Sequence, residues 1–168
     1  MKAPAAYKIL VVCQAGEKTG LGHLSRALVV CRALLQQGFI PELLVHGEPL
    51  PLADKASLSV RFTCSNDLCA TISAIAAENP SDLVIFDLQP QRIPPDITVL
   101  LSALKARGCK LITIDAMADM RQLVDLVFIP AFQLKPELNQ GDTSRLVYGW
   151  DCFLLKVAAR TTQWQDGK

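Results

Sequence analysis

The chain has 168 residues, of which 51% are hydrophobic and 20% are charged, and its formal net charge at pH 7 is +1. This length and composition suit one soluble globular domain with a sizeable core, and they exclude a disordered chain. Because the net charge is near zero and no block of lysine and arginine occurs, no broad electrostatic field would recruit nucleic acid. We therefore expect no nucleic-acid partner, and any phosphate recognition must be local.

The strands and helices are predicted from runs of apolar residues that alternate with longer helical patterns. Such alternation is typical of repeated strand-helix-strand units and indicates an α/β fold, a Rossmann-like three-layer sandwich with a mostly parallel sheet. We expect strands near residues 8–13, 42–46, 59–63, 82–87, 110–115, 125–129 and 146–148.

Three helices are expected between these strands. The first carries a single apolar stripe at three-and-four spacing and ends at Gly38, a C-terminal cap. The second is capped by Asn66 and runs to about Glu78, and the third starts at Pro94-Pro95 and runs to about Arg107. The stripe of the first helix consists of Leu24, Ala27, Leu28, Cys31, Leu34 and Leu35.

The domain is expected to span residues 1–158, with residues 159–168 forming a C-terminal tail or linker and residues 130–143 a mobile loop. The apolar runs are about five to eight residues long, whereas a transmembrane helix needs roughly 18 to 20, so no transmembrane segment is expected. Lys8 interrupts the first run and no cleavage pattern precedes Gln14, which argues against a signal peptide and favours a cytoplasmic protein.

The six cysteines are expected to be reduced and mostly buried as small hydrophobic side chains. Cys64 and Cys69 are the closest pair, but no second pair and no nearby histidine completes a set of metal ligands. The sequence therefore predicts neither a metal site nor a cofactor.

The segment with the most chemistry is Gly20-Leu21-Gly22-His23-Leu24-Ser25-Arg26, at the junction of the first strand and the first helix. Glycines let a backbone approach a ligand closely, and the first amides of a helix point outward with the positive end of its dipole. Arg26 follows His23 by three residues and is expected on the same helix face. The segment therefore predicts an anion site that also holds a base and a cation.

Two familiar phosphate loops do not fit this segment. A P-loop requires a lysine and a hydroxyl residue where Gly22 and His23 stand, and a dinucleotide fingerprint requires a third glycine where Ser25 stands. The alternative is a purely structural role, in which Gly20 and Gly22 only allow the chain to turn and His23 caps the helix.

The Gly-Leu-Gly-His-Leu-x-Arg segment resembles the signature of the SpsG-type spore-coat polysaccharide proteins and of the UDP-sugar hydrolase of pseudaminic acid biosynthesis. These proteins are similar to GT-B glycosyltransferases. The strands that end in Asp87 and Asp115 resemble two strands of the family, and residues 147–155 resemble its passage into a second domain. The resemblance implies one half of a GT-B fold and a UDP-sugar substrate, with His23 as the catalytic base. It places Gly20, Leu21, Gly22, Arg26, Asp87 and Asp115 on the substrate side.

The chain also departs from that pattern. It has Asp87-Leu88-Gln89 where the family commonly has Asp-His-Tyr, and Ala116 where the family commonly has a second Asp. The chain also stops where a second, nucleotide-binding domain is expected to begin. The leading hypothesis is therefore the N-terminal domain of a UDP-sugar hydrolase or glycosyltransferase-like enzyme of cell-surface polysaccharide biosynthesis. The alternative is a non-catalytic half-domain that pairs with a separate nucleotide-binding chain.

Ligands of open parallel sheets bind beyond the carboxyl ends of the strands, where the strand order reverses. Gln14, Asp87 and Asp115 are expected at that edge with the glycine segment. A carboxylate there could orient His23 or bind a sugar hydroxyl, or it could only cap a helix. A helix N-terminus disfavours a second positive charge, so His23 is expected to be neutral near pH 7 and to act as a general base. Arg26 is expected either to stabilise the departing UDP or to pair with Glu17 or Glu48.

Overall fold

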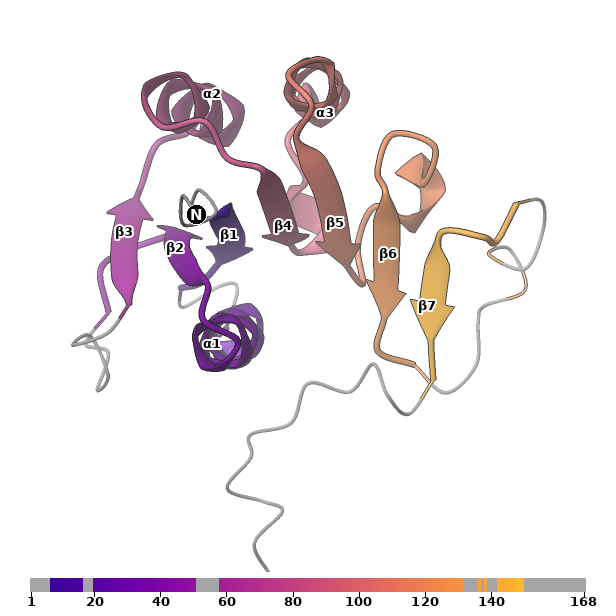
Figure 1. Ribbon diagram of the computed structural model, residues 1–168, viewed down its shortest axis with the longest axis horizontal. Coiled ribbons are helices and arrows are strands. Elements are labelled where there is room, and N and C mark those ends of the chain that lie inside the picture. The colour runs from indigo at the N-terminus through magenta and orange to yellow at the C-terminus, as the bar shows by residue number, and fades with distance from the viewer. Residues whose placement is uncertain are drawn as a thin grey trace, which may run out of the picture.

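The computed structural model describes residues 7–16, 20–50, 58–131, 136, 138 and 142–149. Its centre is a seven-stranded sheet in which every neighbouring pair of strands is parallel, in the order β3-β2-β1-β4-β5-β6-β7 (Figure 1). The strands are β1 (Lys8–Gln14), β2 (Ile40–His46), β3 (Ser59–Thr63), β4 (Leu83–Asp87), β5 (Lys110–Ile114), β6 (Leu126–Ile129) and β7 (Leu146–Tyr148).

The central strands are apolar because helices cover them on both faces. After Lys8, every residue of β1 is buried, and all but the first residue of β4 are buried as well. Near-continuous apolar runs are typical of parallel strands that are buried on both sides. All seven strands were predicted from the sequence, with bounds that differ by at most two residues, so the predicted α/β, Rossmann-like fold class is confirmed.

The helices lie on opposite faces of the sheet. Helix α1 (Gly22–Gln36) lies on one face, and helices α2 (Leu68–Glu78) and α3 (Ile97–Ala106) lie on the other (Figure 1). Short 3-10 turns, η2 (Pro90–Arg92) and η3 (Ala118–Met120), follow β4 and β5. The three layers enclose two apolar clusters, one between α1 and the sheet and one between the sheet and the α2/α3 pair.

Two predicted helix starts were wrong by one to three residues. Helix α2 is capped by Asp67 and not by Asn66, because the Asp67 carboxylate accepts a hydrogen bond of 2.7 Å from the amide of Ala70. Helix α3 begins at Ile97 and not at Pro94, because Pro94 and Pro95 form a turn in which the Ile97 amide donates to the Pro94 carbonyl. The predicted cap of α1 is confirmed, since Gly38 has a φ of +84° and donates to Leu35.

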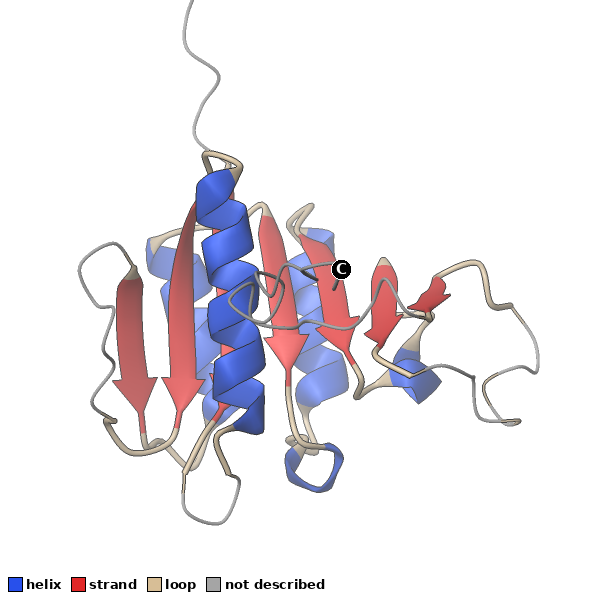
Figure 2. Ribbon diagram, turned by 90° about the horizontal axis from the view of Figure 1, so that it is seen from below, coloured by secondary structure: helices blue, strands red, loops and turns tan. Residues whose placement is uncertain are grey.

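The topology creates one ligand-binding edge. The chain crosses from β1 to β2 over the α1 face and from β4 to β5 over the other face, so strand order reverses between the neighbours β1 and β4. All strands end at the same edge of the sheet, which Figure 2 shows from the side. Ligands of this fold bind beyond that edge, at this reversal.

Several predictions for the chain ends concern residues that are not described. The proposed tail at residues 159–168, and with it the domain boundary at residue 158, lies outside the described residues, as does much of the predicted loop at residues 130–143. Within the described residues, no helix has the length and apolar character required to cross a membrane.

Candidate functional site

Two glycines between β1 and α1 lie next to each other at the carboxyl edge. Gly16 and Gly20 pair through both of their amides, and the Gly20 amide donates to the Gly16 carbonyl at 2.7 Å. Gly20 has a φ of +75°, a conformation that residues with a side chain rarely adopt, so a glycine is required here. Gly22 has no such requirement, and a Cβ atom at its position would meet no atom within 4 Å.

The amino end of α1 has no capping side chain. Its N-cap residue is Leu21, which forms no side-chain cap hydrogen bond, and the first turn contains no acidic residue. The first amides of a helix have no partner within the helix and carry the positive end of its dipole. In contrast to α2, whose cap is Asp67, helix α1 therefore presents free amide donors at the carboxyl edge, next to open space at Gly22.

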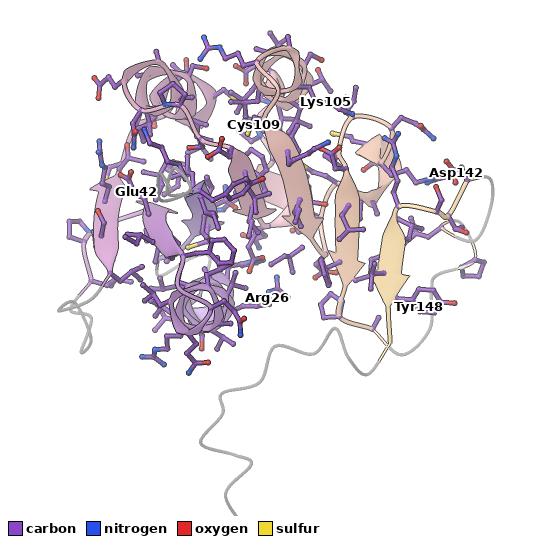
Figure 3. All side chains as sticks on the ribbon, viewed as in Figure 1. Arg26, Glu42, Lys105, Cys109, Asp142 and Tyr148 are labelled. Atoms are coloured by element: carbon purple, nitrogen blue, oxygen red, sulfur yellow. The ribbon has the colours of Figure 1, made fainter. Side chains whose placement is uncertain are left out.

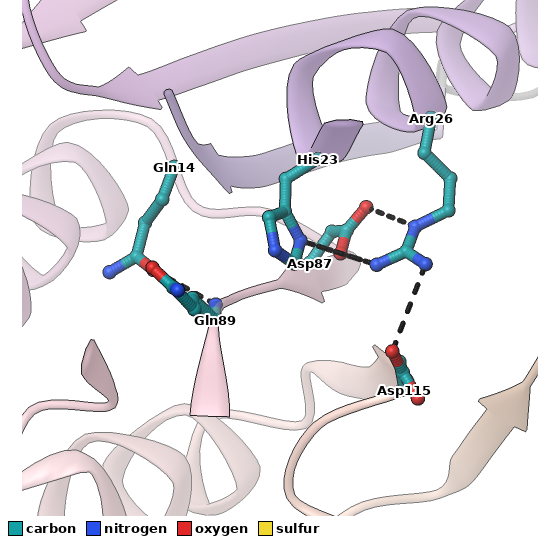
Figure 4. A network of polar contacts seen from close by, with 6 residues as sticks. All are labelled: Gln14, His23, Arg26, Asp87, Gln89 and Asp115. Atoms are coloured by element: carbon teal, nitrogen blue, oxygen red, sulfur yellow. Dashed lines mark hydrogen bonds and ion pairs between the residues drawn. The ribbon is translucent and has the colours of Figure 1, made fainter. Parts of the chain in front are cut away.

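A polar network lies directly beside this helix end (Figure 4). Asp87, the last residue of β4, is fully buried and accepts hydrogen bonds from two residues of α1. His23 Nδ1 lies 2.7 Å from Asp87 Oδ1, and Arg26 Nε donates to Asp87 Oδ2 at 2.8 Å. A second guanidinium nitrogen of Arg26 donates to Asp87 Oδ1, so the arginine binds the carboxylate in a bidentate manner.

This geometry fixes the roles of the histidine nitrogens. An ionised carboxylate only accepts hydrogen bonds, so His23 Nδ1 is the donor to Asp87, and in the neutral imidazole Nε2 is then the accepting nitrogen. Arg26 Nη2 lies 3.2 Å from His23 Nδ1, because both nitrogens donate to the same atom, Asp87 Oδ1. The hydrogen bond to Asp87 raises the pKa of Arg26, and burial, with a smaller contribution from Asp87, raises the pKa of the Cys13 thiol.

Asp115 lies at the edge of this network. Its Oδ2 atom is 3.9 Å from Arg26 Nη1, and its side chain is 52% exposed. Asp115 and Met117 both have positive φ angles, of 68° and 63°, in the turn that follows β5. Residues held in this conformation cost energy and often occur at functional sites, and aspartate tolerates it better than most residues. The turn directs an exposed carboxylate toward the same edge as His23.

The structure brings most of the predicted site residues together. His23, Arg26 and Asp87 are in contact, Asp115 lies beside Arg26, and the backbone of Gly20, Leu21 and Gly22 forms the adjoining helix end. Arg26 pairs with Asp87 and not with Glu48, one of the two partners considered from the sequence; the other, Glu17, lies outside the described residues. Asp87 caps none of the described helices, and its carboxylate accepts from His23, which is the contact that the orienting role considered from the sequence requires.

Sequence reasoning missed the contacts that join the end of β1 to the loop after β4. The buried side chain of Gln14 accepts a hydrogen bond from the Gln89 amide at 2.9 Å and donates to the Arg92 carbonyl at 3.1 Å. Beyond it, a cavity of about 450 Å³ opens at the same edge, lined by residues that include His46, Arg92 and Asp96. Gln14 was placed at the edge by the end of its strand, but no pattern in the sequence indicated its partners.

His46, the last residue of β2, lies with Nε2 3.0 Å from the Ser65 carbonyl oxygen. Within the described part of the chain, no group of three or more His, Cys, Asp or Glu side chains is arranged to hold a metal ion.

No protein-family model matches this chain, and no curated protein matches it. Among solved structures, an alpha-glucosyltransferase in complex with UDP and a 13-mer DNA with a central A:G mismatch matches 95% of this chain and 44% of its own, with a TM-score of 0.53 and 15% sequence identity. The alpha-glucosyltransferase in complex with UDP matches 74% of this chain and 35% of its own, with a TM-score of 0.50 and 12% identity. The DNA/pantothenate metabolism flavoprotein from Streptococcus pneumoniae matches 75% of this chain and 81% of its own, with a TM-score of 0.49 and 15% identity.

At these identities the likeness to the glucosyltransferase structures shows the fold alone. The chain has the Rossmann-like α/β fold that occurs in a UDP-bound glycosyltransferase, and it spans less than half the length of either glucosyltransferase chain. The resemblance to SpsG-type proteins and to the pseudaminic acid hydrolase stays a prediction from the motif.

Proposed function

We propose that this chain is the N-terminal domain of a nucleotide-sugar hydrolase or a glycosyltransferase-like enzyme, and that His23 is its general base. One observation carries the proposal: buried Asp87 accepts from His23 Nδ1 and so leaves Nε2 as the accepting atom, beside the uncapped end of α1. A histidine oriented by a carboxylate, next to free amide donors, is an arrangement suited to removing a proton near a bound anion.

The reaction that fits this arrangement is displacement at the anomeric carbon of a UDP-sugar. His23 Nε2 takes a proton from water, or from an acceptor hydroxyl, as the oxygen forms a bond to that carbon. The bond between the carbon and the diphosphate oxygen breaks, and UDP leaves with the electron pair. The free amides of Gly22 and His23 stabilise the diphosphate through the helix dipole, and the exposed Asp115 carboxylate accepts from a sugar hydroxyl.

The charge balance of the site argues for a second domain or chain. Arg26 is the only cation in the His23–Asp87–Asp115 network as described, and its charge is offset by Asp87, with Asp115 nearby. A UDP diphosphate therefore finds amide donors here but no surplus positive charge. Cations that meet the leaving group must come from elsewhere, which fits a chain that spans under half of the glucosyltransferase structures it resembles.

An amide-resolved NMR titration of the chain with UDP and a panel of UDP-acetamido sugars tests this proposal. We expect chemical shift changes centred on Gly20 to Arg26, with uridine alone producing smaller changes because it lacks the diphosphate. Changes centred elsewhere, or none at millimolar UDP, would overturn the assignment of the donor site and direct the search to a partner chain that binds the nucleotide.

A further inference from the structure

The cavity of about 450 Å³ at the carboxyl edge lies on the α2/α3 side of the sheet. It is bounded by the end of β2, the start of α2 and the segment from η2 to the start of α3. Arg26 extends from α1 on the opposite side of the sheet, whereas Lys105 lies on the α3 side (Figure 3). The lining of the cavity shares no residue with the His23–Asp87–Asp115 network, so the two sites are separate although both lie at one edge.

One wall of the cavity is a turn that a buried side chain holds in place. Gln14 is 2% exposed, and its side chain donates to the Arg92 carbonyl and accepts from the Gln89 amide. The Arg92 amide donates in turn to the Gln89 carbonyl at 2.9 Å, which closes η2. A buried amide side chain is tolerated because both of its polar groups are hydrogen-bonded. The backbone of Arg92 is therefore fixed beside the cavity before any ligand arrives.

Arg92 brings a positive charge to the cavity that the described residues do not use. Its guanidinium has no hydrogen-bond or ion-pair partner among them, whereas Arg26 and Arg145 donate to several acceptors. A guanidinium carries five donors in a fixed planar arrangement. These donors are available to a ligand in the cavity that Arg92 lines.

Asp96 and His46 supply acceptors to the same cavity. Asp96 holds the N-cap position of α3, but its side chain forms no cap hydrogen bond, and the Cys69 thiol that donates to it is a weak donor. Most of the accepting capacity of this carboxylate is therefore unused. His46 Nε2 lies 3.0 Å from the Ser65 carbonyl oxygen, which only accepts, so Nε2 is the donor and in the neutral ring Nδ1 is the accepting nitrogen.

The mixture of groups argues against several ligand classes. The described lining holds one arginine and two aspartates, Asp67 and Asp96, so it offers a phosphate no surplus of positive charge. It includes no Phe, Tyr or Trp on which a nucleobase would stack. Among the described residues no group of three or more His, Cys, Asp or Glu could hold a metal ion. A neutral ligand that both donates and accepts hydrogen bonds fits these groups.

We propose that this cavity binds the ring of a neutral carbohydrate. Each hydroxyl of such a ring donates and accepts, so ring hydroxyls can pair with Arg92, Asp96 and His46. The C–H face of the ring can pack on Ile93 and Pro94, which also line the cavity. The volume of about 450 Å³ falls in the range of roughly 300 to 1,000 Å³ that small-molecule sites occupy.

The source of the ring rests on the proposed function. Asp87 of the network ends β4, and Arg92 of the cavity ends the η2 turn that follows. Gln14, which holds that turn, comes directly after Cys13, the register partner of Asp87. A ring in the cavity therefore lies close to the proposed donor site, either as the sugar of the UDP-sugar or as a second sugar.

Amide-resolved NMR titrations of the chain test the proposal. The probes are glucose, galactose, mannose and their 2-acetamido derivatives at tens of millimolar, together with UDP-acetamido sugars, and uridine is the control ligand. We expect at least one of these sugars to shift the amides of His46, Ile93 and Asp96, and uridine to leave them unchanged. Unchanged amides with every sugar and UDP-sugar, or equal changes with uridine, would overturn the proposal.

The same titrations distinguish the two sources of the ring. Cavity amides that move with a UDP-sugar but not with UDP identify the sugar of the donor. Cavity amides that move when a free sugar is added to chain already saturated with UDP-sugar identify a second sugar. Both results support a carbohydrate site. Failure of the proposed function is read elsewhere, as an absence of changes at Gly20 to Arg26 with UDP.

A matched pair of arginine variants gives an independent readout. Arg92→Ala removes the unused charge, and Arg107→Ala removes an exposed arginine at the far end of α3. We expect the Kd of the bound sugar to rise about tenfold in Arg92→Ala and to stay unchanged in Arg107→Ala, because a hydrogen bond from a charged donor is lost only in the first. The unfolding free energy should be the same in both variants. Equal Kd values in the two variants would also overturn the proposal.

Discussion

At the scale of single residues, Asp87 is the group on which the candidate site depends. It is fully buried, and it meets His23 and Arg26, which are 16% and 20% exposed. A buried charge is tolerated when it is paired and hydrogen-bonded, and removing one partner of such a pair leaves the other poorly solvated. The same carboxylate therefore stabilises the fold, by joining β4 to α1, and positions the proposed base.

We expect Asp87→Asn to destabilise the domain by about 3 kcal/mol, because the guanidinium of Arg26 then faces a neutral amide. The free energy of unfolding in urea measures this loss. Asp115→Asn is the matched control: it removes the same charge from a side chain that is 52% exposed and 3.9 Å from Arg26, so its effect should stay below about 1 kcal/mol. Equal losses in the two variants would show that Asp87 does not hold the network together.

His23→Ala separates catalysis from structure at the same place. In the proposed two-domain enzyme, loss of a general base should lower kcat by about 10² to 10⁴-fold, with the unfolding free energy changed by only about 1 kcal/mol, the contribution of one hydrogen bond. Release of UDP from a UDP-sugar measures kcat. Full activity in His23→Ala would refute the assignment of the base, and a large loss of stability would show that His23 is a structural residue.

At the scale of elements, the end of α1 differs from an ordinary capped helix end. Its N-cap is Leu21, a residue that is 57% exposed and whose side chain offers no acceptor to the helix amides. Replacing a good N-cap residue by an apolar one typically costs about 1 kcal/mol, so this helix end is less stable than it would be with serine or aspartate. An uncapped end beside an oriented histidine is consistent with an anion supplying the missing acceptors.

Gly22→Ala tests whether the open space at this end has a function. The backbone at Gly22 needs no glycine and a Cβ atom meets nothing within 4 Å, so alanine should raise the unfolding free energy by up to about 1 kcal/mol. If a diphosphate occupies that space, the added methyl should weaken UDP binding, about tenfold by NMR titration. Gly20→Ala is the control for backbone strain: its φ of +75° predicts a loss of about 1 kcal/mol. Unchanged UDP binding in Gly22→Ala would place the diphosphate elsewhere.

Sequence reasoning was most reliable where one local rule decides the structure. The strands were predicted because strands that are covered on both faces are short, continuous apolar runs, which are easy to recognise in a sequence. Gly38 was predicted as a cap because it follows the last apolar residues of the helix and glycine readily adopts the positive φ that ends α1 there. The start of α3 was misplaced because a proline pair suits a turn as well as a first helical turn. The choice of Asp67 over Asn66 as a cap depends on which side chain reaches an amide.

The candidate site was predictable only in part, for a reason of distance along the chain. His23 and Arg26 share a helix face, so their proximity follows from helix geometry. Their common partner Asp87 is more than sixty residues away, and the pairing depends on β4 lying beside β1, a strand order that periodicity does not give. The bond from Gln14 to the Arg92 carbonyl depends on the same adjacency and on an irregular turn, η2.

At the scale of the whole molecule, the two apolar clusters each contain cysteines. Cys13 and Cys31 lie in the cluster beside α1, and Cys69 and Cys109 lie in the cluster beside α2 and α3. Burial raises the pKa of all four thiols, to about 12 for Cys31 and Cys69 and about 11 for Cys109. The folded protein therefore keeps these protons at a pH at which the unfolded chain, with thiol pKa values near 9.0, releases them.

The sign of this difference predicts alkaline destabilisation. Above pH 9 the unfolded state binds fewer protons than the folded state, so the unfolding free energy falls as pH rises, whereas below pH 8 these thiols contribute no slope. Urea unfolding under reducing conditions between pH 8 and pH 10.5 measures the slope.

Cys31→Ala removes one buried thiol and should reduce the slope above pH 9 by up to about 1.4 kcal/mol per pH unit. Cys64→Ala is the matched control, because Cys64 is exposed and its removal should leave the slope unchanged. An identical slope in all three proteins would mean that the thiol of Cys31 ionises as readily in the folded domain as in the unfolded chain, and that water reaches the cluster between α1 and the sheet.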